Sequence, residues 1–298
     1  MANTGKPSGD PRFPGIYVAV VTPMNAAGDP DCRRLAEHAA WLLSEGVDGL
    51  VVAGTCGEYA SLDAEERARV VETALGAAKG HPVIVGVAAP STRAVVHWAT
   101  HAKHHGAAAL MALPPLLYRP TSEEVEAHFA AINAVGLPII AYNNTHDTPV
   151  DLTPELLQSL AHLKNLVAVK EFSGDVRRIS ALIEQTELEV LAGADDLVLE
   201  SLLMGATGWI AGLTNVIPRE SVHLYHLARA GRLEAARDLY RALLPLLRYD
   251  STPLLVQAIK FGMAERGRDV GGTRAPRLPL APHHQAAIRA ALAALPAE

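Results

Sequence analysis

The sequence predicts a closed (β/α)8 barrel, the TIM-barrel architecture, with a C-terminal helical extension. Short apolar runs alternate with amphipathic stretches between residues 16 and 218, at roughly 20–35 residues per unit, as in parallel strands joined by helices. An open doubly wound sheet is the alternative. However, the turn after the first strand reads VTPM (21–24), and no G-x-G-x-x-G fingerprint follows it. Eight such units without that fingerprint favour the barrel.

The elements can be placed in order along the chain. Apolar runs suit strands covered on both faces, and they lie at 16–21, 49–52, 83–87, 107–112, 138–142, 166–170, 188–191 and 207–211. Helical periodicity predicts helices at 32–44, 64–79, 92–105, 123–135, 154–162, 176–185 and 196–204. Residues typical of helix N-caps stand at or near the starts of several of them, namely Asp31, Asp63, Ser91, Thr153 and Asp175.

Three segments organise the chain. Residues 1–15 are rich in Gly and Pro and predict a mobile leader, and residues 16–218 form the barrel with the catalytic site. Beyond 218 the alternation stops, and helical patterns follow at 219–230, 233–248, 253–266 and 283–295. One helix would close the barrel, so the rest is an appended extension. No linker composition separates residues 219–298, so we treat them as part of the same domain.

Composition restricts the class of protein. The chain has 298 residues, 49% of them hydrophobic, which is enough apolar material for a large core. A net charge of −6 and the lack of a Lys/Arg-rich run argue against nucleic acid or an anionic membrane as a partner. Cys32 and Cys56 form neither a disulfide framework nor a zinc pattern. With no signal core and no spanning run, we expect a soluble, cytoplasmic protein that acts on a small molecule.

Lys170 is the first candidate catalytic residue. It ends the apolar run of the stretch LVAVKEFSG (166–174), where a strand should still be surrounded by core. Burial disfavours an ammonium group there, and a neutral amine can attack a carbonyl to form a Schiff base. The alternative is a lysine that pairs with Glu171 or extends its amine to solvent from the strand end.

Two further strand ends carry polar residues. The GTCGE turn (54–58) contains two glycines and could present consecutive backbone N–H groups to a carboxylate. The alternative is an ordinary turn with Glu58 facing solvent. Tyr142 ends the fifth predicted strand, where its phenol could transfer protons in the barrel mouth. The alternative is a tyrosine that only packs in the core.

Five motifs together resemble one family. The order VTP (21–23), GTCGE (54–58), AYNN (141–144), VKEFSGD (169–175) and GADD (193–196) is similar to the dihydrodipicolinate synthase and N-acetylneuraminate lyase family, over nearly the whole chain. The resemblance implies a (β/α)8 barrel with helical extension, usually a homotetramer. It also implies class I chemistry, in which a lysine forms a Schiff base with no metal or organic cofactor.

The resemblance also implies roles for residues at matching positions. Lys170 matches the Schiff-base lysine, and Tyr142 matches the tyrosine that shuttles protons. Thr55 and Cys56 match the pair whose backbone N–H groups hold the carboxylate of a 2-oxo acid. Ile210 matches the position whose carbonyl faces the lysine. The expected substrate is therefore a 2-oxo acid or a cyclic imine derived from one.

The sequence departs from the synthase pattern at the distal end of the site. Cys56 replaces the second hydroxyl residue of the usual GTTGE turn, and Leu117 stands at the relay tyrosine, one residue before Tyr118. Asp147 stands where the synthases place a carboxylate-binding arginine, and Thr145 replaces the usual proline. A carboxylate there repels a carboxylate substrate, so we predict that the protein is not the lysine-pathway synthase and that Asp147 contacts another substrate.

Several functions stay open at this point. Within the family, a 4-hydroxy-1-pyrroline-2-carboxylate deaminase or a sugar-acid dehydratase or aldolase fits these departures. A catalytically silent sensor of small carboxylates is the alternative from another class, although a sensor has no need for both Lys170 and Tyr142. A metal-dependent aldolase barrel is a third, minor reading.

Two further groups of residues are candidate ligand sites. His97, His101 and His105 recur every four residues, with His104 beside them, and this spacing can place imidazoles on one helix face. The third helix of a barrel faces outward, so we expect a solvated face and no metal site. Glycines 193, 208 and 212 could form a phosphate site but lack a basic partner.

Overall fold

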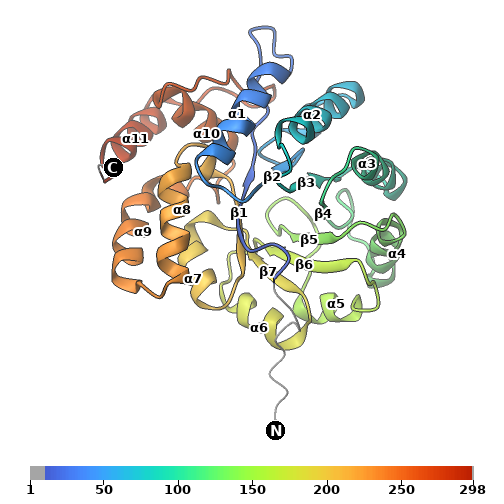
Figure 1. Ribbon diagram of the computed structural model, residues 1–298. Coiled ribbons are helices and arrows are strands. Elements are labelled where there is room, and N and C mark those ends of the chain that lie inside the picture. The colour runs from blue at the N-terminus through green and yellow to red at the C-terminus, as the bar shows by residue number, and fades with distance from the viewer. Residues whose placement is uncertain (1–10, 297–298) are drawn as a thin grey trace.

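The computed structural model describes residues 11–296 and forms a closed parallel barrel with helices on its outside (Figure 1). The strands pair in sequence order, and β8 closes on β1. They are β1 (Gly15–Ala19), β2 (Gly49–Val52), β3 (Val83–Gly86), β4 (Ala109–Ala112), β5 (Ile139–Asn143), β6 (Leu166–Glu171), β7 (Glu189–Ala192) and β8 (Gly208–Ala211). The predicted barrel is confirmed, with strand ends displaced by up to two residues.

Helices follow the strands around the barrel. They are α1 (Cys32–Ser44), α2 (Ala64–Ala77), α3 (Thr92–His104), α4 (Ser122–Asn133), α5 (Pro154–Ser159), α6 (Arg177–Gln185), α7 (Val198–Leu203) and α8 (Pro218–Arg229). Short 3-10 turns occur at η1 (Tyr59–Ser61), η2 (Asp195–Leu197) and η3 (Leu213–Asn215). The helix predicted at 196–204 is in fact η2 followed by α7, because the chain first turns inward to bury Asp195.

Most of the predicted helix starts are confirmed by their capping bonds. The side chains of Asp31, Asp63, Ser91 and Thr153 each accept a backbone N–H from the first turn of the helix that follows. Asp175 does not cap α6, whose N-cap is Val176. The carboxylate of Asp175 instead accepts from the backbone and the guanidinium of Arg177.

The strands are buried on both faces, and the barrel interior is narrow. A Cβ on Gly86 of β3 would lie 2.4 Å from the carbonyl oxygen of Ala53, which follows β2. Only glycine lets the two backbones approach this closely. Apolar side chains on the outer face of the strands pack against the helices, so the interior and the helix layer form one continuous core.

Part of the predicted leader is packed against the barrel. The backbone N–H groups of Arg12 and Phe13 donate to the carboxylate of Glu189, and Phe13 is buried. Within the predicted leader, Arg12 and Phe13 thus contact the end of the barrel, to which Phe13 supplies apolar surface. The remainder of the predicted mobile leader, residues 1–10, lies outside the described residues.

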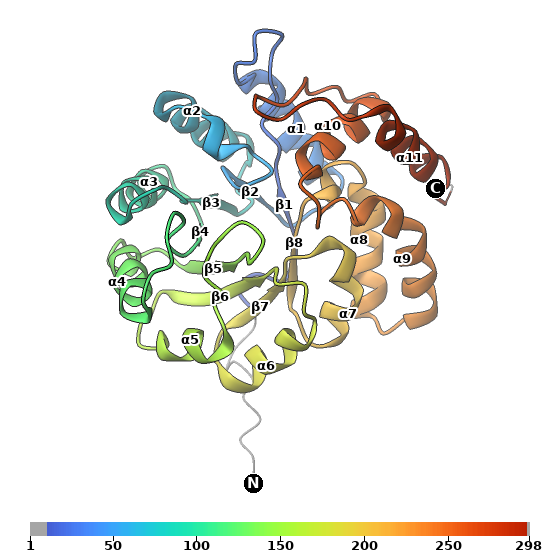
Figure 2. The ribbon, with the colours of Figure 1, turned by 180° about the vertical axis from the view of Figure 1, so that it is seen from behind.

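The C-terminal extension consists of α9 (Leu233–Leu247), α10 (Leu255–Glu265) and α11 (Pro282–Ala293). Figures 1 and 2 show these helices on the side of the barrel that carries α1, α7 and α8. The chain between α9 and α10 and the chain between α10 and α11 both reach the carboxyl ends of the strands. Within residues 11–296, no helix combines the length and apolar character needed to cross a membrane.

Candidate active site

Lys170 and Tyr142 lie side by side on adjacent strands. They are paired in register between β6 and β5, and the Lys170 amine lies 4.4 Å from the centre of the Tyr142 ring. Side chains alternate along a strand, so these two share one face while Glu171 and Asn143 share the other. Both residues are nearly inaccessible to solvent, at 6% and 5% exposure. The register therefore brings an amine and a phenol together inside the barrel.

Glu171 does not neutralise Lys170. Its carboxylate accepts from the side-chain amide of Asn143 at 3.0 Å and from the backbone N–H of Ser173 at 2.6 Å. Across the described chain, the side-chain amine of Lys170 makes no hydrogen bond and no salt bridge. The alternative of a lysine paired to its neighbour is thus contradicted, because strand alternation sends the two side chains in opposite directions.

The environment of Tyr142 keeps its phenol protonated. Burial raises the pKa of Tyr142 well above its ordinary value, and the nearby carboxyl of Asp250 acts in the same direction. The side-chain amide of Asn144 donates to the phenol oxygen at 3.2 Å and to Asp147 at 2.8 Å. Because Asn144 occupies an acceptor position on the oxygen, the phenol proton is free to point elsewhere.

Left-handed backbone occurs at Glu58, the last residue of the GTCGE turn, and at Ala53, which directly precedes the turn. Ala53 and Glu58 have φ angles of 56° and 55°, which is unfavourable for residues other than glycine. Glu58 is buried and does not face solvent, contrary to the alternative considered for this turn. Its carboxylate accepts from the Lys260 amine at 2.7 Å, and Thr22 Oγ1 donates to the Gly57 carbonyl at 2.7 Å. These contacts fix the conformation of the turn.

One cavity of about 390 Å³ collects most of the predicted site residues. Its lining includes Thr55, Cys56, Tyr142, Asp147 and Lys170. Ile210 is fully buried in β8 and is not among the lining residues, whereas Gly212 is. Burial raises the pKa of the Cys56 thiol to about 12, so this cysteine is a neutral neighbour of the amine and not a nucleophile.

Two buried carboxyl groups near Lys170 were not predicted as site residues, although Asp195 belongs to the GADD motif. Asp195 accepts from Trp209 Nε1 at 2.8 Å and from the backbone N–H of Leu213 at 2.7 Å, while burial raises its pKa to about 6. Asp250 accepts from the backbone N–H of Asp195 at 2.9 Å, and burial raises its pKa well above the ordinary range. The Lys170 charge acts against both of these shifts. Two buried carboxyl groups with raised pKa values thus lie beside the amine.

The extension also contributes residues that were missed. Ser251, Thr252 and Arg277 line the cavity, and Arg277 lies 3.6 Å from the Glu58 carboxylate. The D-S-T-P turn before the predicted helix 253–266 was visible as a cluster of polar residues, but nothing in the sequence placed it over the barrel. His146, which also lines the cavity, packs its ring against Phe172 at 5.3 Å.

The glycines considered for a phosphate site have other roles. A Cβ on Gly193 would lie 2.5 Å from the Glu171 carbonyl oxygen. The backbone N–H of Gly212 already donates to the carboxylate of Asp195. A phosphate would need free N–H donors here, and an acidic side chain occupies that position instead.

The cavity places an unpaired lysine beside a protonated tyrosine at the carboxyl ends of barrel strands, and a family model matches this chain. The model is described as the dihydrodipicolinate synthetase family and matches residues 12–295. The chain belongs to this family. Members are class I enzymes that work through a lysine Schiff base, and this protein is a Schiff-base lyase of the same kind.

Individual relatives agree with the family assignment. A 4-hydroxy-tetrahydrodipicolinate synthase from Pseudomonas savastanoi is 35% identical over 88% of this chain and 91% of its own length. The enzyme of that name from Methanocaldococcus jannaschii is 31% identical, over 92% and 95%. Among solved structures, a chloride-inhibited dihydrodipicolinate synthase from Acinetobacter baumannii, complexed with pyruvate, has a TM-score of 0.90 at 31% identity, covering 95% of this chain and 98% of that one.

Proposed function

We propose that Lys170 forms a Schiff base with the C2 carbonyl of pyruvate or a longer 2-oxo acid. The observation that carries this is the unpaired Lys170 amine, 4.4 Å from the ring of a protonated tyrosine. The neutral amine adds to C2, and the carbinolamine oxygen takes up protons and leaves as water. Loss of a proton from C3 of the imine then gives the enamine that aldolases and lyases share. Tyr142 is the proposed donor to the leaving oxygen.

The GTCGE turn is the proposed binding site for the substrate carboxylate. In the described chain, the backbone N–H groups of Thr55 and Cys56 donate no hydrogen bond to protein. Both residues line the cavity with Lys170, so these donors are available to an anion. Oriented N–H groups stabilise a carboxylate without a charged side chain. Replacement of a hydroxyl by the Cys56 thiol leaves this backbone contact intact.

We further propose that the distal part of the substrate carries hydroxyl or amine groups. Asp147 lines the mouth of the cavity, and Asn144 holds its carboxylate in place. A carboxylate accepts hydrogen bonds, so it suits such groups and repels a second carboxylate. A hydroxylated 2-oxo acid or cyclic imine that loses water or ammonia, or undergoes aldol cleavage, suits a cavity lined by Asp147. The condensation of pyruvate with aspartate semialdehyde fits it poorly.

That condensation stays the second candidate because of Arg277. This arginine lines the same cavity as Asp147 and could receive a distal carboxylate, although Glu58 already attracts its guanidinium. The relatives named as 4-hydroxy-tetrahydrodipicolinate synthases support the same reading. Arg119, which directly follows Tyr118, is exposed and does not line the cavity.

Borohydride trapping tests the Schiff base. Incubation with pyruvate and sodium borohydride should add the reduced pyruvate mass to the peptide that contains Lys170. Lys170→Ala should abolish the adduct, while Lys164→Ala, a change outside the cavity, should not. An adduct of undiminished yield in Lys170→Ala would overturn the assignment.

A substrate panel tests the distal wall. Purified protein should turn over hydroxylated 2-oxo acids, sugar acids or hydroxyproline-derived imines in preference to pyruvate with aspartate semialdehyde. Asp147→Arg should raise the synthase rate and lower the rate with the hydroxylated substrate. Robust synthase turnover in the wild type, lost in Arg277→Ala, would establish the second candidate instead.

We also propose that the protein is a homotetramer, as the family resemblance implies. Leu117 and Tyr118 are exposed large side chains in the loop after β4, at 76% and 55% exposure. In the proposed tetramer, we expect a neighbouring subunit to cover these two side chains. Sedimentation equilibrium of the full chain measures the assembly directly.

A further inference from the structure

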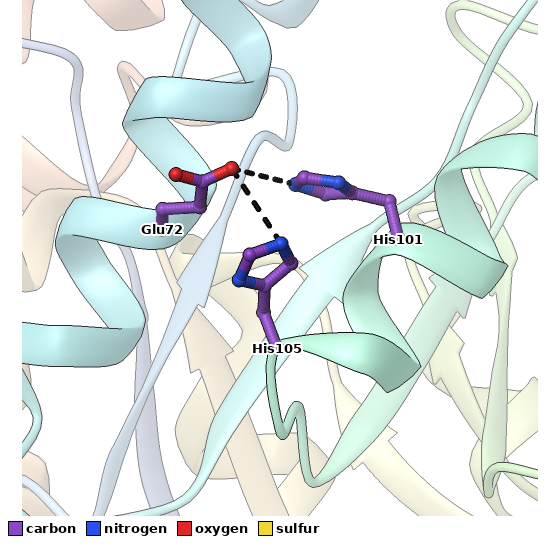
Figure 3. Close-up of side chains that lie close together, drawn as sticks. All are labelled: Glu72, His101 and His105. Atoms are coloured by element: carbon purple, nitrogen blue, oxygen red, sulfur yellow. Dashed lines mark ion pairs between the residues drawn. The ribbon is translucent and has the colours of Figure 1, made fainter.

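A cluster of three potential metal ligands lies between α2 and α3, outside the barrel. Glu72 belongs to α2, and His101 and His105 belong to α3; Figure 3 shows both imidazoles turned toward the Glu72 carboxylate. Each Nε2 lies 3.6 Å from the same oxygen, Glu72 Oε1. The ligand atoms of the three residues all lie within 4.8 Å of one another. His105 is the C-cap residue of α3, so the helix end holds it in register.

The spacing of this cluster is near that of a tetrahedral metal site. Zn²⁺ binds imidazole nitrogen and carboxylate oxygen at about 2.0–2.2 Å, which puts ligand atoms roughly 3.4 Å apart around a tetrahedron. Two of the three separations are already 3.6 Å. Histidines at i and i+4 share one face of a helix, so small side-chain rotations would bring both nitrogens to one ion. Three protein ligands would leave a fourth position for water.

Hydrogen bonding does not account for this arrangement. A separation of 3.6 Å is too long for an N–H···O bond, so neither imidazole donates well to Glu72. The Nε2 atom of His101 is buried and makes no hydrogen bond within the described part of the chain. An unpaired nitrogen therefore points at a carboxylate without bonding to it.

We propose that Glu72, His101 and His105 bind a divalent transition-metal ion such as Zn²⁺ and thereby clamp α2 to α3. The sequence predicted a solvated histidine face from the pattern of α3 alone. The Glu72 carboxylate comes from the neighbouring helix α2 and could not be seen in that pattern. A bound ion would stabilise the folded chain, because it binds the assembled site in preference to the unfolded chain. His97 and His104 lie on the same helix but do not belong to the three-ligand group.

Zinc titration of the full-length, untagged and chelator-treated protein tests the site. Calorimetry should show one high-affinity Zn²⁺ per chain, and Co²⁺ should give the absorption bands of tetrahedral coordination. Thermal unfolding should move to higher temperature when Zn²⁺ is added. Loss of one of the three ligands should weaken Zn²⁺ binding by about tenfold or more, because even the loss of a residue that only hydrogen-bonds to a metal ligand has an effect of that size.

The informative variants are Glu72→Gln and His105→Ala, because both residues are partly exposed and their replacement should leave the fold intact. Each should lose the high-affinity site and the thermal shift. His162→Ala is the matched control, since His162 faces Glu126 at 3.3 Å as a pair without a third ligand. Zinc affinity that is unchanged in Glu72→Gln and His105→Ala would overturn the proposal. So would the absence of a high-affinity site in the wild type, or an equal loss in His162→Ala.

Discussion

At the residue scale, the surroundings of Tyr142 decide what its phenol can do. Burial and the adjacent carboxyl of Asp250 both hold the phenol in its neutral form, and Asn144 donates to its oxygen. A neutral phenol whose oxygen already accepts a hydrogen bond must donate its proton before it can act as a base. It can take a proton back only after giving one away. This order suits carbinolamine dehydration, where the oxygen must be protonated before it leaves.

The corresponding prediction concerns Tyr142→Phe. Removal of the phenol should lower turnover by roughly 10²–10⁴-fold, the usual contribution of one positioned acid or base. Binding of the 2-oxo acid should change little, because the GTCGE turn is untouched. Steady-state kinetics on the best substrate of the panel gives both quantities. Tyr118→Phe is the control, since Tyr118 is 55% exposed and lies outside the cavity lining. Near-normal turnover in Tyr142→Phe would assign the proton to another group.

The candidate site residues identified in the sequence share one property. Lys170, Tyr142 and the GTCGE turn directly follow or end strands, so the barrel alone places them at one rim. Asp250 and Arg277 could not be placed, because they come from connections between helices of the extension. Their position depends on how that extension packs, which no local pattern encodes.

At the scale of elements, the GTCGE turn depends on α10. Its left-handed Glu58 is 0% exposed at the side chain and pairs with Lys260, which is 3% exposed. Burial lowers the pKa of Lys260, and the attraction of Glu58 opposes that shift. The backbone N–H of Arg274 also donates to the Glu58 carboxylate. The GTCGE turn after β2 is thus anchored from more than 200 residues further along the chain.

Breaking this pair should be costly. Lys260→Met should destabilise the fold by about 3–5 kcal/mol, because it removes the 2.7 Å ion pair of the buried Glu58 carboxylate and leaves only Arg277, at 3.6 Å, as a cation. Urea unfolding measures the change, and the KM for the 2-oxo acid should rise as the turn loosens. The double variant Glu58→Gln with Lys260→Met should recover part of the stability. Arg33→Met is the control: its partner is Glu37, both are largely exposed, and the effect should be within about 1 kcal/mol. A loss of stability in Lys260→Met no larger than that in Arg33→Met would contradict the importance of the buried pair.

Helices were predicted more accurately at their starts than at their ends. N-caps such as Asp63 and Thr153 have a side-chain chemistry that can be read directly from the sequence. Helix ends have weaker signals, and α2 stops two residues before the predicted Lys79. The prediction of Asp175 as an N-cap was wrong, because its carboxylate accepts from the guanidinium of Arg177 and Val176 occupies the capping position. Competition between partners for one side chain is not visible in a one-dimensional pattern.

At the scale of the whole molecule, Arg274 joins the extension to the barrel. Its guanidinium donates to Glu66 on α2 at 2.6–2.7 Å and to the carbonyls of Gly28 and Ser61. Alternating strands and helices predicted the barrel, and the end of that alternation predicted the extension. The contact between the two parts could not be predicted, because it consists of single polar residues far apart in the sequence.

The Arg274 contact gives a pH-dependent stability that can be measured. Hydrogen bonds from Arg274 lower the pKa of Glu66 from its ordinary 4.5 to about 2. A carboxyl whose pKa is depressed on folding stabilises the protein above its unfolded pKa and loses that effect as pH falls through the folded value. The contribution of Glu66 should therefore be complete above about pH 5 and disappear between pH 4.5 and pH 2.

Glu66→Gln tests this directly. At pH 7 the variant should be less stable by about 1.5–3 kcal/mol, the range for hydrogen bonds to charged groups. The difference from wild type should shrink steadily below pH 4.5, because the wild-type carboxyl then becomes protonated as well. Urea unfolding at pH 7, 5, 4 and 3 supplies the comparison. Glu65→Gln is the matched control, one residue earlier on α2 and 91% exposed, and should show little difference at any pH. A Glu66→Gln deficit that stays constant down to pH 3 would mean that Arg274 acts through its carbonyl contacts, and that the charge on Glu66 does not hold the extension to the barrel.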